Sequence, residues 1–383
     1  MKINQWTLGL AAAGVVSLAS AVQAEEAKNQ VLTAVSSTTI SGFVSTSARW
    51  DLGTPAGVNA YKYAAPAGVS KGDGFNLDVV NLTVSKAAGE GDWAAGYKAE
   101  LVFGPDAAQI NPAGNNIKQA YVSLRAPVGN GLDLKMGVFD SIVGYESTNA
   151  GDNPNYTRSW GHTIDPSQHT GLLAGYRFND TVALTVGAAN TTGIGAGGIN
   201  AKVASAQSQK TYLAGITLTA GDSLGFLKGG TLTAAAVDGR AAGAVAGPDA
   251  SSIYVGATLP TGIENLTLGA AWDHRNVDKA SDTEAMAVYL SYKASDKLKV
   301  NVRADYLDNG GALVAPYGLG VEILTSTVTL DYALWENVIS RVEWRWDHAM
   351  SGRQGAVGGA GVGPFGGGRV NANMVALNVI YKF

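Results

Sequence analysis

Hydrophobic and polar residues alternate with a period of two along most of the chain. Between positions 338 and 348, Val342 and Trp344 fall on one parity, and Arg341 and Glu343 fall on the other. Successive side chains of a β-strand point to opposite faces, so this segment has one apolar face and one charged face. A helical stripe with a period of 3.6 residues is not evident. The pattern therefore predicts strands from end to end.

About 16 segments follow this alternation, and each predicts one strand. They span 38–50, 74–86, 92–103, 117–126, 131–138, 169–178, 181–190, 209–220, 230–238, 251–260, 264–273, 283–294, 297–307, 321–334, 337–348 and 372–383. Short connections alternate with long ones, so all the long connections emerge at one end of the strand array. The long connections span 51–73, 104–116, 139–168, 191–208, 239–250, 274–282, 308–320 and 349–371.

An even number of antiparallel strands with this arrangement of turns is typical of an outer-membrane β-barrel. We predict an all-β fold, a single transmembrane antiparallel barrel over 38–383, with short periplasmic turns and long extracellular loops. Aromatic residues near the strand ends, such as Trp50, Trp93, Tyr212 and Tyr332, fit interfacial girdles. A soluble β-sandwich or propeller is the alternative, disfavoured because lysine and arginine occur along so many strands.

Composition supports this interpretation. Of 383 residues, 46% are hydrophobic and only 15% are charged, whereas soluble domains carry about 25% charge. The formal net charge of −4 offers no electrostatic footprint for nucleic acid, so we expect no nucleic-acid partner. The chain has 50 glycines and no cysteine, which excludes disulfides and cysteine-based zinc sites. We expect no cofactor.

The N-terminus carries a targeting signal. Lys2 precedes an apolar, alanine-rich stretch, and Val22 and Ala24 place small residues before a cleavage point at Glu25. We therefore expect residues 1–24 to be a cleaved signal peptide and 25–37 to be a short N-terminal segment ahead of the barrel. An uncleaved membrane anchor is the alternative. Export with a barrel fold predicts the bacterial outer membrane as the location and its lipid as a partner.

The final strand adds a second signal. Val375, Leu377, Val379 and Tyr381 alternate up to Phe383. An alternating apolar strand that closes on an aromatic residue resembles the signature that the outer-membrane assembly machinery reads. We expect this machinery to be a partner of the chain through Phe383.

A barrel of about 16 strands is too wide for its own side chains to fill, so it leaves an aqueous channel. We predict a water-filled porin for passive diffusion of ions and small hydrophilic solutes. Many charged residues have the parity of the lumen, although they could also simply pair across neighbouring strands. The candidate pore-lining residues on the wall are Arg49, Lys98, Arg125, Lys135, Arg303, Arg341, Glu343 and Arg345.

The third long connection, 139–168, is the candidate constriction. A loop of this length without periodicity is usually functional. Apart from Arg158, its charges are acidic, and we expect them to face the basic wall residues across a narrowed pore; an extracellular lid is the alternative. The acidic residues are Asp140, Glu146, Asp152 and Asp165. We further expect Gly144 to permit a sharp bend, and Glu146 and Arg158 to pin the loop by a mutual charge-assisted hydrogen bond.

Five short motifs also resemble a known family. They read IKQAYV at 117–122, GVFD at 137–140, IVGYE at 142–146, NYTRS at 155–159 and HTG at 169–171. In this order they resemble the core of the OmpL-like putative β-barrel porin family. The resemblance implies an outer-membrane porin of a Gram-negative-type bacterium and does not identify a solute. Val138 departs from the family pattern, which puts one pore-facing charge in doubt.

Other functions find less support. The esterase-like tetrapeptide at 221–224 lies in a predicted turn and lacks a partner histidine motif, and no serine and histidine fit an outer-membrane phospholipase. The four histidines lack metal-ligand spacing, so we predict no enzyme. A substrate-specific channel, for example for sugars, is an open alternative, although its lumenal aromatics are scattered: Phe43, Tyr121, Phe139 and Tyr254. A non-conducting structural or adhesive barrel and a homotrimeric assembly also stay open.

Overall fold

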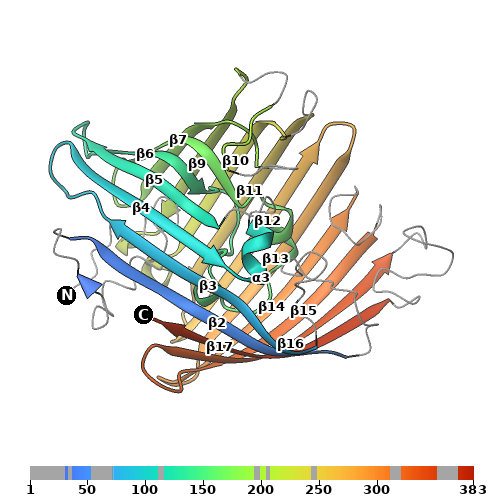
Figure 1. The fold of residues 1–383 in the computed structure, drawn as a ribbon. Helices are drawn as coiled ribbons and strands as arrows, with labels where there is room; N and C mark the ends of the chain where they lie inside the picture. The colour runs from blue at the N-terminus through green and yellow to red at the C-terminus, as the bar shows by residue number, and fades with distance from the viewer. Residues whose placement is uncertain are drawn as a thin grey trace.

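Sixteen antiparallel strands, β2 to β17, form one closed barrel (Figure 1). The computed structural model describes residues 31–32, 37–52, 71, 73–110, 116–193, 199–203, 208–242, 248–310, 321–351 and 370–383. The strands are β2 (Thr39–Leu52), β3 (Gly74–Lys86), β4 (Ala94–Phe103), β5 (Ile117–Ala126), β6 (Leu132–Asp140), β7 (Gln168–Arg177), β8 (Val182–Ala189), β9 (Thr211–Thr219), β10 (Thr231–Arg240), β11 (Asp249–Pro260), β12 (Leu266–Val277), β13 (Ser281–Lys293), β14 (Leu298–Asn309), β15 (Val321–Tyr332), β16 (Val338–Ser351) and β17 (Asn371–Lys382). A two-residue strand, β1 (Val31–Leu32), pairs with the start of β2.

The seam that closes the barrel joins β17 to β2. Their register runs from Asn373 opposite Leu52 to Lys382 opposite Phe43. Beyond it, Gly42 and Phe383 exchange two backbone hydrogen bonds of 2.9 Å. Closure leaves no strand with an unpaired edge, which a bilayer would not tolerate. The predicted antiparallel barrel is confirmed, and every strand lies close to its predicted position.

The outer surface is apolar, as a lipid-facing wall must be. Val122, Met136, Leu172 and Val288 project from four different strands and are 47–71% exposed in the isolated chain. Aromatic side chains are exposed near strand ends, among them Trp50, Trp93, Tyr212, Tyr332 and Phe383. In water such a surface would be unfavourable, whereas in a bilayer it meets hydrocarbon.

The prediction of a long loop at 274–282 was wrong. β12 continues to Val277 and β13 begins at Ser281, so only residues 278–280 form the turn. Its polar residues suggested a loop, but they continue the strand alternation. Lys279 has a φ of 57°, typical of a tight turn. The long connection 139–168 is fully described, whereas the other six long connections lie partly outside the described residues, as do the signal segment 1–24 and most of 25–37.

The described part of the chain also contains four short helices: α3 (Pro105–Ile110), η2 (Ala150–Asp152), α4 (Trp160–Ile164) and η3 (Asp222–Leu227). No helix within the described ranges is long and apolar enough to cross a bilayer.

The inside of the barrel is not polar all round. Between β6 and β13 its inner face carries a cluster of buried apolar side chains, and two residues of the 139–168 connection, Ile142 and Val143, pack into the cluster. The wall residues of this apolar patch are Phe139, Leu173, Ala189, Leu213, Ala235, Val237, Tyr254, Ala271, Ala287 and Tyr289. Apolar side chains that faced only water would be exposed. Their burial means that another part of the chain, which includes Ile142 and Val143, covers the patch from the lumen.

Candidate functional site: a loop fixed inside the barrel

The candidate site is built around residues 141–167, which we call L3. L3 leaves β6 after Asp140, lies inside the barrel and returns at Gln168 of β7. Its short helix α4 packs on β12, β13 and β14, on the far side of the lumen from β6. L3 therefore crosses the interior of the barrel.

The first half of L3 depends on a glycine bend. Gly144 has a φ of 105°, a conformation that L side chains rarely adopt. A Cβ at this position would also lie 2.7 Å from the Asp165 carboxylate. Past the bend, the ring of Tyr145 stacks on Tyr289 with 4.3 Å between centroids, and its hydroxyl accepts a hydrogen bond from Thr258. The Tyr145 hydroxyl also lies where a Cβ on Gly269 would be, so a larger residue at Gly269 would displace the ring.

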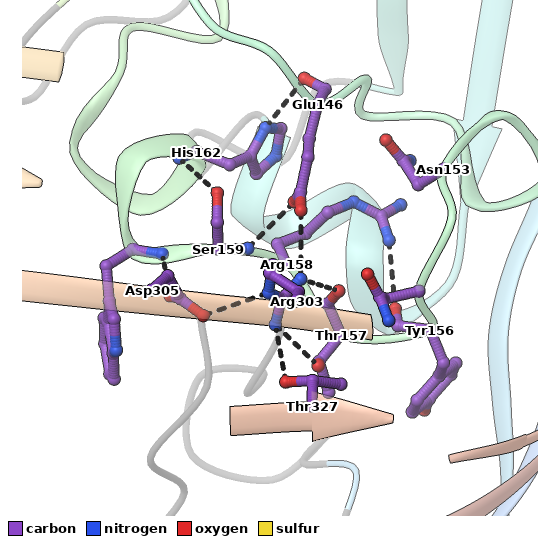
Figure 2. A network of polar contacts seen from close by, with 12 residues as sticks. Glu146, Asn153, Tyr156, Thr157, Arg158, Ser159, His162, Arg303, Asp305 and Thr327 are labelled. Carbon is purple, nitrogen blue, oxygen red and sulfur yellow. Dashed lines mark hydrogen bonds and ion pairs between the residues drawn. The ribbon is translucent and has the colours of Figure 1, made fainter. Parts of the chain in front are cut away.

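The second half of L3 is held by a buried ionic network (Figure 2). Arg303 on β14 donates to the Glu146 carboxylate at 2.9 Å and to the Thr157 carbonyl at 2.8 Å. Glu146 also accepts from the backbone N–H of Ser159 at 2.8 Å, and Asp305 pairs with Arg303 at 3.0 Å. The side chains of Arg303, Glu146 and Asp305 have no exposed surface. Charges buried this deeply persist only when they are paired and hydrogen-bonded.

Glu343 on β16 binds the backbone of L3. Its carboxylate accepts from the N–H groups of Tyr156 and Thr157 at 2.6 and 2.9 Å, and from the Thr157 hydroxyl at 2.6 Å. The Thr329 hydroxyl on β15 donates to the same carboxylate at 2.7 Å. Four donors on one buried carboxylate fix this turn of L3 against the wall.

Arg341 and Arg345, also on β16, bind L3 through carbonyl groups. Arg341 donates to the carbonyl oxygens of Ala150 and Asn153 at 2.8 and 2.7 Å. Arg345 donates to the Arg158 carbonyl at 2.7 Å, and its guanidinium lies 5.1 Å from the centre of the Trp160 ring. Both arginines were expected to line the pore. Arg341 is nearly buried but does contribute to the lining of the cavity inside the barrel, whereas Arg345 is covered by L3 and does not.

Glu146 and Arg158 do not form the expected mutual bond among the contacts of the described residues. Arg158 instead donates to the carbonyl oxygens of Ser147, Thr148 and Tyr156, so it braces L3 internally. Glu146 takes its positive partner, Arg303, from a strand 157 residues away. Spacing within the loop could not reveal a partner that distant.

The start of L3 is fixed by a second charged cluster. Asp140 pairs with Lys118 at 3.0 Å, and Lys118 also contacts Glu100 at 3.2 Å. Glu100 pairs in addition with Lys98 at 2.8 Å and accepts from Gln119 at 2.8 Å. Lys118 and Gln119 were not among the candidate residues, although both belong to the IKQAYV motif, which was the available signal.

The remaining candidates fall into two groups. Asp152 lies 3.7 Å from Lys382, and Asp165 lies at the Gly144 bend, so both belong to L3 and its supports. Arg49 pairs with Asp51 at 2.8 Å, and Arg125 pairs with Asp133 at 3.0 Å, so both bind within the wall. Lys135 also lies on the wall, with its ammonium 4.9 Å from the centre of the Tyr121 ring.

A third cluster lies beside L3 at Tyr156. The Lys71 ammonium pairs with Asp106 on α3 at 2.6 Å and with Asp78 on β3 at 3.2 Å. The Tyr156 hydroxyl donates to Asp78 at 3.0 Å. Burial raises the pKa of Asp106 to about 6, and the charge of Asp78 acts in the same direction while Lys71 opposes it. The cluster links L3 to the connection that precedes β3 and to the one that follows β4.

A cavity of about 1690 Å³ lies inside the barrel next to L3. Part of its lining comes from L3, from residues between 141 and 154 and again from 162 and 165–167, and most of the rest comes from strand residues and from short turns such as 295–297. The short turns mark the predicted periplasmic end, so the cavity reaches from L3 towards that end. The basic candidates Lys98, Arg125, Lys135 and Arg341 are among its wall residues, whereas Arg49, Arg303 and Arg345 are not.

A closed barrel with an apolar outer wall, an internal cavity and a loop folded inside is the architecture of a bacterial outer-membrane porin. The family model described as "Putative beta-barrel porin-2, OmpL-like" matches residues 37–383. The chain belongs to this family. No curated protein sequence matches the chain significantly.

Solved structures of porins share the fold at low sequence identity. The outer membrane channel DcaP of Acinetobacter baumannii is 15% identical, with a TM-score of 0.59 over 92% of this chain and 99% of that one. An anion-selective porin from Comamonas acidovorans is 14% identical, with a TM-score of 0.59 over 91% and 99%. The trimer form of in-vitro folded OmpT, an outer membrane protein of Vibrio cholerae, is 11% identical, with a TM-score of 0.57 over 90% and 99%.

Proposed function

We propose that this porin is a water-filled, non-enzymatic channel for passive diffusion of ions and small hydrophilic solutes, with L3 as its constriction. The observation that carries the proposal is the cavity of about 1690 Å³ beside L3, whose lining includes many charged and hydroxyl-bearing side chains. Because L3 crosses the lumen between β6 and β13, it narrows the path that a solute would follow. Pore diameter and the charges at the narrowest point then set what passes.

The acidic residues of the connection 139–168 contribute less to this filter than the sequence suggested. Asp140 contacts Lys118, and Glu146 contacts Arg303, at about hydrogen-bond distance rather than across open space. Such pairs neutralise each other locally. In the proposed channel, L3 therefore acts mainly by its volume, and ion preference depends on the wall charges that line the cavity.

Planar-bilayer recording of the purified, refolded protein tests the proposal. Discrete conductance steps are expected, and the same preparation heated to unfold the barrel provides the control. Steps that saturate with one solute would show a substrate-specific channel. Electrical silence from correctly folded protein would contradict the proposal and would favour a structural or adhesive barrel.

Delivery to the outer membrane is proposed to use the signal peptide 1–24 and the strand ending in Phe383. N-terminal sequencing of protein recovered from outer membranes should begin at Glu25. Phe383→Ala should lower the amount of folded barrel in the membrane, because Phe383 lies at the β17–β2 seam. An unprocessed N-terminus, or unchanged assembly of the variant, would contradict these two steps respectively.

The porin is further proposed to be a homotrimer. Support comes from the trimer form of OmpT from Vibrio cholerae, which has the same fold. Mass determination in detergent by light scattering should give three chains per particle. A monomeric particle at all protein concentrations would contradict this assembly.

A further inference from the structure

The two sides of the cavity differ in chemistry. On one side, β4, β5 and β6 present Lys98, Tyr121 and Lys135. Lys135 lies against the Tyr121 ring, and Lys98 pairs with Glu100. With the buried Lys118 behind them and the neighbouring pair of Arg125 and Asp133, the charged residues of these three strands are four bases and three acids, Glu100, Asp133 and Asp140, a net charge of +1. We call Lys98, Tyr121 and Lys135 the cationic wall.

On the other side, the strands from β10 to β13 present hydroxyl groups. We call this side the hydroxyl wall, and its members are Thr233, Tyr254, Thr258, Thr267, Tyr289 and Ser291. Strands β10 to β12 contribute no charged side chain to the part of the lining that the structure describes. Tyr145 of L3 extends the same surface, since its hydroxyl binds Thr258. The six named members can thus donate and accept many hydrogen bonds and carry no formal charge; the charge that β13 brings to the described lining is Lys293, at the end of the strand.

The two walls face each other across the lumen. β5 and β13 are eight strands apart in a barrel of sixteen, so they lie on opposite sides. A solute that passes L3 therefore meets a cationic surface on one side and a neutral, hydroxyl-rich and aromatic surface on the other. Aromatic rings pack well against the C–H faces of a sugar ring, and hydroxyl groups match its hydroxyls.

We infer that the channel binds hydroxylated organic anions, of which a sugar acid is the simplest representative. This inference rests on the proposed channel function and names its solute class. The carboxylate lies against Lys98 and Lys135, and the hydroxylated body lies along Tyr254, Thr258 and Tyr145. An ammonium-bearing sugar is repelled by the cationic wall, and a neutral sugar uses only the hydroxyl wall.

Three pyranoses of similar size test this solute class: glucuronate, glucose and protonated glucosamine. Each is added to a conducting channel in potassium chloride, and the concentration that halves the current is measured. Glucuronate should act at a concentration about tenfold lower than glucose, because a charge-assisted hydrogen bond contributes enough for that factor. Glucosamine should be weaker than glucose. Equal effects of the three sugars would overturn the inference while leaving the channel function intact.

Variants then assign the effect to the walls. Lys98→Gln/Lys135→Gln should remove the advantage of glucuronate over glucose and leave the effect of glucose unchanged. The charge-matched control is Lys228→Gln/Lys279→Gln, whose lysines are more than 50% exposed and lie outside the cavity lining. The assignment to the cationic wall would be contradicted if the control variant no longer bound glucuronate better than glucose. It would also be contradicted if the wall variant still did.

Acetate tests the hydroxyl wall, since it has the same charge as glucuronate without a hydroxylated body. It should halve the current only at a much higher concentration than glucuronate. If acetate acts as strongly, the hydroxyl wall does not bind solute and the inference fails. If the protein gives no conductance at all, the failure belongs to the proposed function.

Discussion

The two halves of L3 are held inside the barrel by different forces. Ile142 and Val143 pack on the apolar patch of β6 to β13. Past the Gly144 bend, Glu146 and the backbone near Thr157 are held by Arg303 and Glu343 through charge-assisted bonds. Apolar contact is non-directional and tolerates small movements, whereas the buried ionic network fixes one geometry. The apolar half therefore keeps L3 in the lumen, and the ionic half sets its exact position.

The largest effect is expected from Arg303→Met. It leaves Glu146 and Asp305 buried without their shared partner, which costs about 3–5 kcal/mol of unfolding free energy. The second half of L3 should then detach, giving noisier and larger conductance steps. Guanidinium unfolding in detergent micelles and single-channel recording measure the two effects.

The matched control for Arg303 is Arg240→Met. Arg240 pairs with Asp249 at 3.2 Å at the end of β10, where the two side chains are 32% and 71% exposed. Exposed pairs contribute about 0–1 kcal/mol, so this variant should be nearly silent. If the two variants lost the same unfolding free energy, burial would not be the reason why the ion pairs of Arg303 stabilise the protein.

A smaller effect is expected from Ile142→Ala, which removes apolar contact without exposing a charge. The loss should be about 2–3 kcal/mol, at the low end for a large-to-small change because L3 can settle into the space. The loss should not change with salt concentration. Ile216→Ala, on the outward face of β9, where Ile216 is 40% exposed, is the matched control and should cost less. A salt-dependent loss would show that the two halves of L3 are coupled.

The smallest effect is expected from Thr258→Val, which removes the donor to the Tyr145 hydroxyl. A neutral hydrogen bond of this kind contributes about 1 kcal/mol. Tyr145→Phe should have a similar cost, and the double variant should cost less than the sum of the two. Strict additivity in this cycle, measured by the same unfolding experiment, would show that the bond contributes nothing.

The barrel could be predicted from the sequence because alternation is a local property. Arg303 and Asp305 alternate with Val302 and Ala304 on one short segment, and no distant information is needed to read that strand. The error at 274–282 has the same origin, since His274 and Arg275 look like loop residues although β12 includes both. Polarity alone does not separate a loop from the end of a strand that faces water on both sides.

The site was predictable only in its location. The acidic residues of 139–168 and the arginines of β14 and β16 were recognised, but the contacts that join L3 to β14 and β16 connect residues more than 140 positions apart in sequence. The lumenal aromatic set included Phe139 and Tyr254 of the apolar patch but missed Tyr289, and the aliphatic residues of the patch were not recognised. Leu173 and Leu213 have the parity of a wet lumen, and only the fold of L3 explains why they are apolar.

The seam between β2 and β17 also has a consequence for the order of events during biosynthesis. β2 is the first strand of the barrel to be synthesised and β17 is the last, yet each needs the other to complete its backbone hydrogen bonds. Until β17 is available, the growing sheet has two open edges, which invite aggregation. The barrel therefore cannot close while the chain is being made, and it must be kept apart from other chains until β17 arrives.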